Sequence, residues 1–329
     1  MSADRARDFL TRAEASNLGR ETIGQLTDDV RRLVVSYQQQ PLTGLLSEMA
    51  DTQDRAFGLL EGRQKPEQTR DLYLLAGVAS GLMAKVSQDL GAPHDALTQA
   101  RVAYACADNA GHDGLRAWIR GLQALITYWD GRFDDSIRYA RLGAEAAEHS
   151  RGTAAVWLIS GEARALAALG RRDEAHAAID RASEAREHVE PDELDQMGGL
   201  CTFNRPRQLY YAADALVWGG ETDAGRTERT AIEAMEAYAA APAANRAYGD
   251  ESGTSCALAI ARILQGELEG AVETMEPVLS LAVDQRIHGI VTSVEHVRTV
   301  LHGIANPDRW ARDLLDAVES FTSDRLALP

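Results

Sequence analysis

Apolar residues recur three and four positions apart along most of the chain. Between Thr69 and Leu90, one such stripe contains Leu72, Leu75, Ala76, Ala79, Leu82, Met83 and Val86. This spacing places apolar side chains on one face of an α-helix, whereas a half-buried strand alternates apolar and polar positions. Glycines and prolines divide the chain into segments of helical length, and no segment alternates with period two over the length of a strand. The pattern predicts an all-α protein.

The predicted helices are grouped in pairs around turn glycines. These glycines are Gly91, Gly131, Gly170 and Gly266, with a weaker copy at Gly219. A small residue lies five positions after each of the first four glycines (Ala96, Ser136, Ala175, Ala271), and another lies seven positions before it (Ala84, Ala124, Ala163, Ala259). Two antiparallel helices joined by a tight turn approach closely only where both present small side chains. Each glycine is therefore predicted to join the two helices of a hairpin.

The turns resemble the tetratricopeptide pattern G-x-[FY]-x-[DE]-A, most clearly at 131–136 and 170–175. Successive turn glycines are 40, 39, 49 and 47 residues apart, longer than the ~34 residues of the standard repeat. Insertions explain the excess: 190–203 is predicted as a short helix and a loop, and 239–253 as a second inserted loop. Because no linker interrupts the pattern, we predict one right-handed solenoid of degenerate helix pairs over 1–329. Its parts are N-terminal capping helices (1–65), repeats (66–282) and C-terminal capping helices (283–329).

Charge and composition exclude some classes of function for this chain. The chain has 34 Lys and Arg against 50 Asp and Glu, a net charge of −16, which disfavours an exposed nucleic-acid or anionic-membrane surface. The three cysteines lie in apolar settings without a CxxC pair, and no uncharged stretch approaches the ~20 residues of a membrane span. We therefore expect a cytoplasmic protein without contact to a membrane.

Signatures of enzymes are not found. The sequence has no GxxxxGK[ST], GxGxxG, GxSxG or HExxH motif, and its only lysines are Lys65 and Lys85. His288 and His296 are eight residues apart, about 12 Å along a helix, which is too far for one metal ion. We expect no catalytic residue, no metal and no cofactor.

Four blocks of sequence carry a family resemblance: 61–82, 87–126, 191–218 and 285–301, the first reading EGRQKPEQTRDLYLLAGVASGL. Together they resemble the tetratricopeptide-like C-terminal region of actinobacterial XRE-type helix-turn-helix transcriptional regulators. The resemblance covers roughly 10–305 and excludes the tail 306–329. Those regulators carry an N-terminal DNA-binding domain, and this chain starts where that domain would have ended. The resemblance implies a regulator's sensing or interaction module that stands alone.

A DNA-reading motif is the main alternative near the N-terminus. Ala15 and Gly19 have the four-residue offset of a helix-turn-helix, which would make 20–29 the recognition helix. That segment ends in two aspartates and also carries Glu21, so it would bring acidic groups to phosphates. We therefore expect a plain helical hairpin in the N-terminal cap. An intact transcriptional regulator acting on DNA and a structural protein–protein adaptor remain the alternative functions.

The candidate site follows from the repeat register, in which the first helix of each pair lines a concave groove. The register places seven residues in that groove: Trp118, Tyr128, Trp157, Arg164, Arg207, Tyr210 and Asp214. Aromatic rings and arginines are enriched where binding energy concentrates. The hypothesis is a non-enzymatic regulatory protein that binds a peptide, a small ligand or a protein partner there, and a homodimer is compatible with it. The alternative is that the rings fill the core and the arginines pair with acids such as Glu162 or Asp214.

Overall fold

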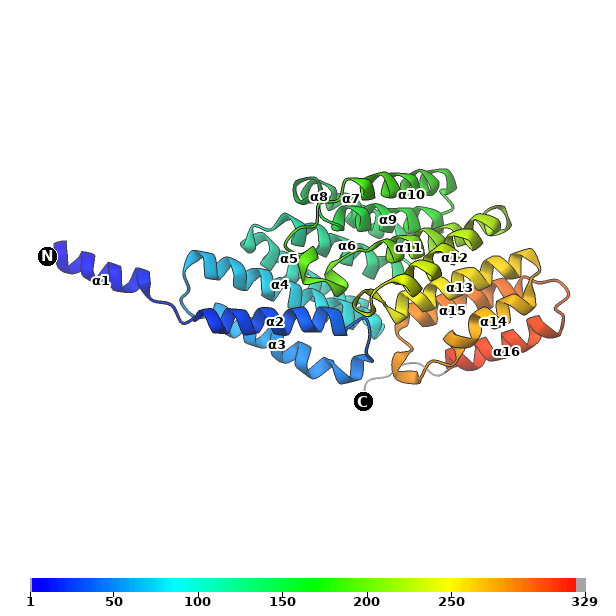
Figure 1. The fold of residues 1–329 in the computed structure, drawn as a ribbon, viewed down its shortest axis with the longest axis horizontal. Helices are drawn as coiled ribbons and strands as arrows, with labels where there is room; N and C mark the ends of the chain where they lie inside the picture. Colours follow the sequence, from blue (N-terminus) through cyan, green and yellow to red (C-terminus); the bar gives the residue numbers. More distant parts are fainter. Residues whose placement is uncertain (1, 324–329) are drawn as a thin grey trace.

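In the computed structural model, residues 2–323 are described, and all regular structure among them is helical. This agrees with the predicted all-α class. Six consecutive helix pairs account for most of the chain (Figure 1): α4 (Pro66–Asp89) with α5 (Pro93–Ala110), α6 (Asp113–Trp129) with α7 (Phe133–Leu142), α9 (Ala154–Ala168) with α10 (Arg172–Glu187), α11 (Arg205–Val217) with α12 (Ala224–Ala240), α13 (Tyr248–Gln265) with α14 (Leu268–Leu279), and α15 (His288–His302) with α16 (Arg309–Ser323). Residues 324–329 of the predicted C-terminal cap lie outside the described part.

The turn glycines have the backbone conformation that a tight hairpin requires. Gly91, Gly131, Gly170 and Gly266 have φ between 72° and 80°, a left-handed conformation that side chains with a Cβ rarely adopt. In the weaker copy the positive φ of 58° belongs to Gly220, one residue later than predicted. All eight small residues that flank the four clear turns are buried, as expected where two helices approach closely.

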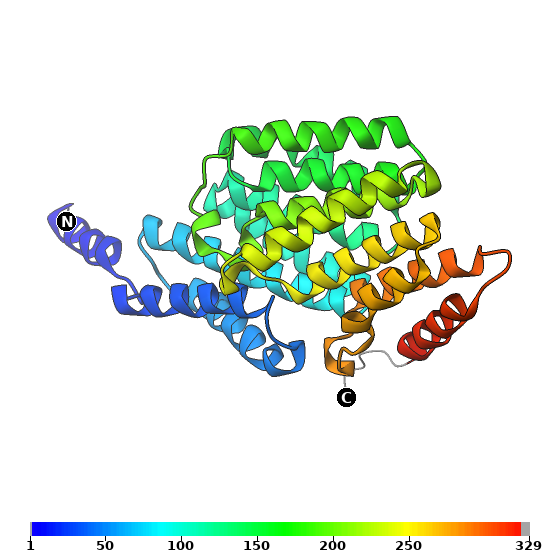
Figure 2. The same cartoon turned by 45° about the vertical axis from the view of Figure 1, so that its right-hand side comes forward.

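The first helices of consecutive pairs form an inner layer. α6 packs on α9, α9 on α11, α11 on α13, and α13 on α15, and the two views in Figures 1 and 2 show these helices running side by side. α15 also contacts α4 and α6 from the beginning of the series. The inner helices therefore surround an interior instead of leaving an open face.

The N-terminal helices do not form the predicted hairpin. α1 (Ser2–Glu14) extends away from the rest of the molecule (Figure 1), whereas α2 (Arg20–Ser36) and α3 (Leu46–Leu60) pack on α4. α1 carries Phe9 and Leu10 with 68% and 56% of their surface exposed. A hairpin would bury such residues against α2, so the exposure of this apolar pair agrees with the position of α1 and contradicts the prediction.

The two insertions differ in structure. Residues 190–203 form two 3-10 turns, η2 (Asp195–Met197) and η3 (Gly199–Cys201), and a Cβ at Gly199 would clash with the α2 backbone at Val34. The second insertion was predicted as a loop through 248–253, but these residues are the first turns of α13. Asp250 and Glu251 suit the positive end of that helix, and Gly253 has no side chain to collide with the Tyr210 ring.

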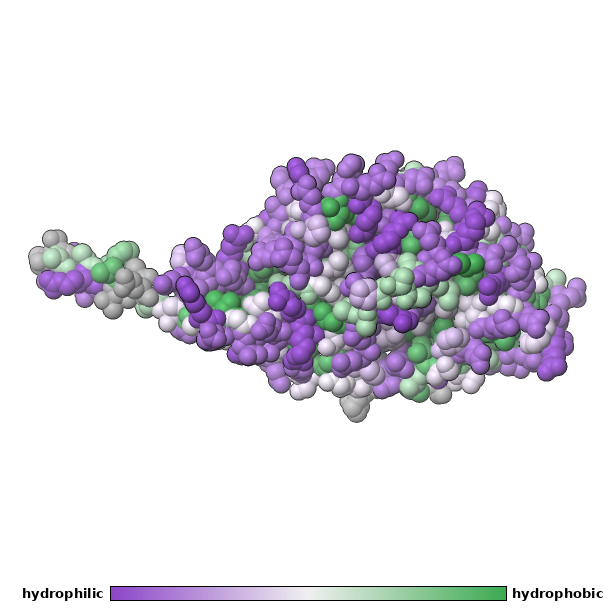
Figure 3. All heavy atoms as spheres, in the orientation of Figure 1, coloured by the Kyte–Doolittle hydropathy of each residue, from purple (hydrophilic) through white to green (hydrophobic). Residues whose placement is uncertain are grey.

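The face of the molecule drawn in Figure 3 is polar apart from small apolar areas. In the view of Figure 3 hydrophilic residues cover most of the face, and apolar residues appear between them. Among the described residues, no helix combines the length and the apolar character needed to cross a lipid bilayer.

Candidate functional site

The seven predicted site residues lie on three adjacent inner helices. Trp118 and Tyr128 belong to α6, Trp157 and Arg164 to α9, and Arg207, Tyr210 and Asp214 to α11. Six of them are buried, and the side chain of Asp214 is 15% exposed. The structure thus brings the set together, but it places the residues inside the molecule and not on an open groove.

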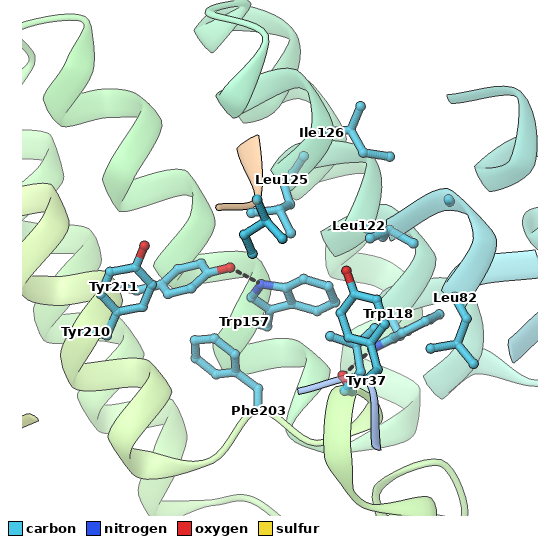
Figure 4. Close-up of a cluster of buried hydrophobic side chains, with 14 of the residues drawn as sticks. Tyr37, Leu82, Trp118, Leu122, Leu125, Ile126, Trp157, Phe203, Tyr210 and Tyr211 are labelled. Carbon is cyan, nitrogen blue, oxygen red and sulfur yellow. Dashed lines mark hydrogen bonds between the residues drawn. The ribbon is translucent and has the colours of Figure 1, made fainter. Parts of the chain in front are cut away.

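Three of the aromatic members, Trp118, Trp157 and Tyr210, pack with Phe203 and Tyr211 into one cluster (Figure 4). Trp118 lies 6.2 Å from Trp157 between ring centroids, and Trp157 stacks on Phe203 at the same separation. The Trp157 indole N–H donates to the Tyr211 hydroxyl at 3.0 Å, and the Trp118 N–H donates to the Leu200 carbonyl at 3.1 Å. These rings fill the space between helices, which is what the alternative interpretation of the sequence expected of them.

Arg164 is enclosed by aromatic rings. Its guanidinium carbon lies 4.1 Å from the centre of the Tyr128 ring and 4.3 Å from that of Tyr211, distances at which a cation is attracted to a ring face. Nε donates to Asp214 at 2.7 Å, and the Tyr128 hydroxyl donates to the same carboxylate at 2.9 Å. Arg164 is 1% exposed, and its Nη2 has no hydrogen-bond partner among the described residues.

Arg207 pairs with an acid that the sequence did not single out. Its Nε donates to Asp250 at 2.7 Å, and the Tyr238 hydroxyl donates to the same carboxylate at 3.0 Å. The Gln38 amide, oriented with its oxygen toward Arg207, accepts from Nη2. The Nε and Nη2 donors of Arg207 therefore both have hydrogen-bond partners, whereas Nη2 of Arg164 has none among the described residues.

A third ion pair completes the interior. The Lys85 ammonium donates to both oxygens of Asp89, at 2.5 and 2.6 Å, and the Tyr37 hydroxyl also donates to Asp89. The side chains of Lys85 and Asp89 are 13% and 2% exposed. Both residues lie on α4, whose apolar pattern is that of an ordinary core helix. Apart from the rarity of lysine in this chain, nothing in the sequence indicated that this pair would be buried.

These groups border a small cavity. It has a volume of about 60 Å³, and four of the predicted residues line it: Trp157, Arg164, Arg207 and Tyr210. Tyr128 and Asp214 belong to the network behind Arg164, whereas Trp118 does not reach the cavity. A neighbouring cavity of about 50 Å³ shares Lys85, Asp89, Leu200, Arg207, Gly249, Asp250 and Ile287 with the first. The two together form a polar region inside the helix layer.

Burial and charge set the protonation of the surrounding groups. Burial raises the pKa of Tyr128, Tyr210 and Tyr211, so these hydroxyls stay protonated at neutral pH. Burial alone would lower the pKa of Arg164, but the Asp214 carboxylate and the tyrosines outweigh it and hold the pKa well above its usual range. Arg164 is therefore a permanent cation, and its pairing with Asp214 is electrostatically strong.

The three cysteines are buried and lie outside the ion pairs described above. Burial raises the pKa of the Cys106 thiol to about 11 and that of Cys201 and Cys256 further, so these thiols are protonated at neutral pH. Within residues 2–323, His, Cys, Asp and Glu nowhere form a group of three or more that could hold a metal ion.

The sequence matches no protein-family model, and no curated protein matches it at a significant level. A role for the cavity must therefore be inferred from its own geometry.

Proposed function

We propose that the chain is a non-enzymatic regulatory binding protein built as a right-handed, tetratricopeptide-like solenoid, and that it holds a small ligand in the cavity between its inner helices. The left-handed turn glycines, the buried small residues on both sides of each turn and the side-by-side packing of first helices support this arrangement. The four sequence blocks that resemble the sensing region of XRE-type regulators support a regulatory role in the cytoplasm.

The observation that carries the proposal is an internal cavity lined by two arginines, a lysine and two carboxylates. Empty cavities in proteins are apolar, whereas a cavity with polar walls holds water or another polar group. The lining therefore favours occupation by a polar group. A water molecule is the simplest such group, and the experiment must separate it from a ligand.

A binding role also fits the enclosure of the site. Because α15 packs back onto α4 and α6, a ligand in the cavity touches helices from both ends of the series. Its occupation would stabilise the closed arrangement, which a partner protein could sense at the outer surface. We do not propose direct DNA reading, because Glu21, Asp28 and Asp29 lie in the segment of α2 that would have to approach the phosphates.

The test compares the wild type with two charge-neutral variants. The buried-pair variant, Arg164→Met with Asp214→Asn, removes both charges together, so neither is left uncompensated in the interior. The surface-pair variant, Arg32→Met with Glu48→Gln, makes the same changes in side-chain type where the partners are 48% and 42% exposed. Circular dichroism would establish that both variants are folded.

Each protein would be purified from the same cells and denatured, and the released small molecules would be identified by mass spectrometry. We expect one compound in near-stoichiometric amount from the wild type and the surface-pair variant, and its loss from the buried-pair variant. Identical spectra from all three proteins, together with a crystal structure that shows only water in the cavity, would contradict the proposal.

A further inference from the structure

A second cavity lies between the outer helices α10 and α12, above a floor formed by α9 and α11. It has a volume of about 150 Å³ and shares no lining residue with the internal cavity. On α11 the residues that line it, among them Gln208 and Ala212, lie on the face opposite to Arg207 and Asp214. We call this space the outer cavity, and it is separate from the site proposed above.

Polar contacts at both ends of the outer helices hold this space open. Near the start of α10, Arg172 pairs with Asp223, which precedes α12, at 2.6 Å. In the last turn of α10, Arg186 donates to the Phe203 carbonyl at 2.6 Å, just before α11 begins. Between these ends α10 and α12 hardly contact each other, and the Ala182 side chain that α10 presents there is too short to fill the gap.

The size and the walls of the outer cavity suit a compact apolar group. Ile179, Leu209 and Leu216 line it, and each is at least nine-tenths buried. Protein interiors contain few voids larger than a water molecule, and an engineered apolar cavity of about 150 Å³ takes up benzene. A ring of about six heavy atoms therefore fits the outer cavity.

Charge at the outer cavity is balanced within the protein. Arg205 pairs with Glu233 at 3.0 Å, and Arg226 pairs with Asp180 at 3.4 Å. Since both arginines that line the cavity already have carboxylate partners, a charged ligand would find no free counter-charge there. Burying a charge without a partner is costly, so the outer cavity favours a neutral ligand.

Gln208 gives the outer cavity a polar group that can orient such a ligand. The residue is 3% exposed, and its Oε1 accepts from Arg186 Nε at 2.8 Å, which fixes the orientation of the amide. Its Nε2 donates to none of the described residues and, unlike Nη2 of Arg164, stays within reach of a water-sized molecule. Gln208 lies on the same face of α11 as Ala212, so this donor needs an acceptor at the cavity.

We infer that the outer cavity binds a small neutral molecule that has an apolar ring and a carbonyl oxygen. The ring packs against Ile179, Leu209 and Leu216, and the carbonyl oxygen accepts a hydrogen bond from Gln208 Nε2. This inference does not depend on the proposed function, because the two cavities have no lining residue in common. Water alone in the outer cavity is the result that the experiment has to separate from binding.

The test uses cyclohexanone, with cyclohexylammonium as a probe that has the same ring but a charged donor in place of the carbonyl. Each would be titrated into the protein, and binding would be read from saturation transfer to the ring protons. Gln208→Glu keeps the shape of the side chain and the acceptor for Arg186, whose acceptors in the described chain are neutral, but removes the amide donor. Gln196→Glu makes the same change at an exposed position and is the matched control.

We expect saturable binding of cyclohexanone to the wild type and to Gln196→Glu, and binding weakened at least about fivefold in Gln208→Glu. Ala212→Leu fills the outer cavity and should abolish binding, whereas the buried-pair variant should bind like the wild type. No saturable binding, equal binding in all variants, or equal binding of cyclohexylammonium would overturn the inference. A loss confined to the buried-pair variant would also overturn it, because it would place the probe in the internal cavity.

Discussion

Ion pairs in the described part of this protein lie both on the solvated surface, as at the start of the outer helix α10, and around the internal cavity. Arg171 and Glu174 lie one turn apart at the start of α10, and their side chains are 39% and 54% exposed. Lys85 and Asp89 are also one turn apart, on α4, but both are nearly buried. Similar spacing in the sequence therefore produces a solvated pair in one region and an interior pair in the other.

Solvated and interior ion pairs differ in how much they contribute to the free energy of unfolding. Solvated pairs contribute about 0–1 kcal/mol to stability, so their absence would cost little. Interior pairs lose hydration, and apolar residues of similar volume are often as stabilising or more so. Three such pairs around one cavity are therefore poorly explained by stability alone, and they are compatible with the binding role proposed above.

The largest expected effect comes from breaking one interior pair. Arg164→Met leaves the Asp214 carboxylate without its partner, and we expect a loss of about 3–5 kcal/mol in the free energy of unfolding, measured with urea. Arg32→Met, at a solvated pair, should cost less than about 1 kcal/mol. Equal losses in the two variants would mean that burial does not distinguish the two settings.

We expect a loss of stability of intermediate size when the contact between two paired helices is overpacked. Ala175 is buried against the preceding helix of its hairpin, so Ala175→Leu should overpack the crossing and lower stability by about 1–3 kcal/mol. Ala177 lies two residues further along α10 and is exposed, so Ala177→Leu should change stability by less than about 0.5 kcal/mol. A similar unfolding midpoint for both variants would contradict the repeat register.

The smallest effect concerns pH and His296, whose ring lies 4.7 Å from that of Trp218 at the edge of the Tyr128 network. Burial lowers the pKa of His296, and the nearby Asp214 only partly opposes this. Below about pH 6.5 the unfolded chain binds a proton there that the folded chain does not, so stability falls as the pH drops. We expect His296→Gln to flatten this slope by at most about 1.4 kcal/mol per pH unit. His149→Gln, on the surface, serves as the control, and equal slopes in wild type and His296→Gln would refute the assignment.

The sequence predicted what depends on local pattern. Apolar periodicity located the helices, and turn glycines with small flanking residues located four of the hairpins, because both are set by neighbours within one turn of chain. The prediction was wrong at 248–253, where glycines and acidic residues suggested a loop. There the packing of Gly253 on Tyr210, a contact between distant segments, allows the helix to begin earlier.

The candidate site was predicted only in part for the same reason. The register selected residues on α6, α9 and α11, and four of them line the cavity. It could not select Lys85, Asp250 or the beginnings of α13 and α15, because these reach the cavity only when the last helices pack back onto the first ones. The spacing of residues within one repeat does not predict contacts between the last and the first helices.

The return of α15 to α4 and α6 bears on how the molecule folds and unfolds. An open series of repeats, in which each contacts only its neighbours, can lose its ends one unit at a time. Here the contacts that close the series join residues far apart in the sequence, as in the His288 ring, whose Nε2 lies 3.4 Å from the carbonyl oxygen of Trp129, 159 positions away. Local hairpins can form early, but closure has to wait for the whole chain. We therefore expect the end helices to resist fraying and the closed body to melt in one cooperative transition.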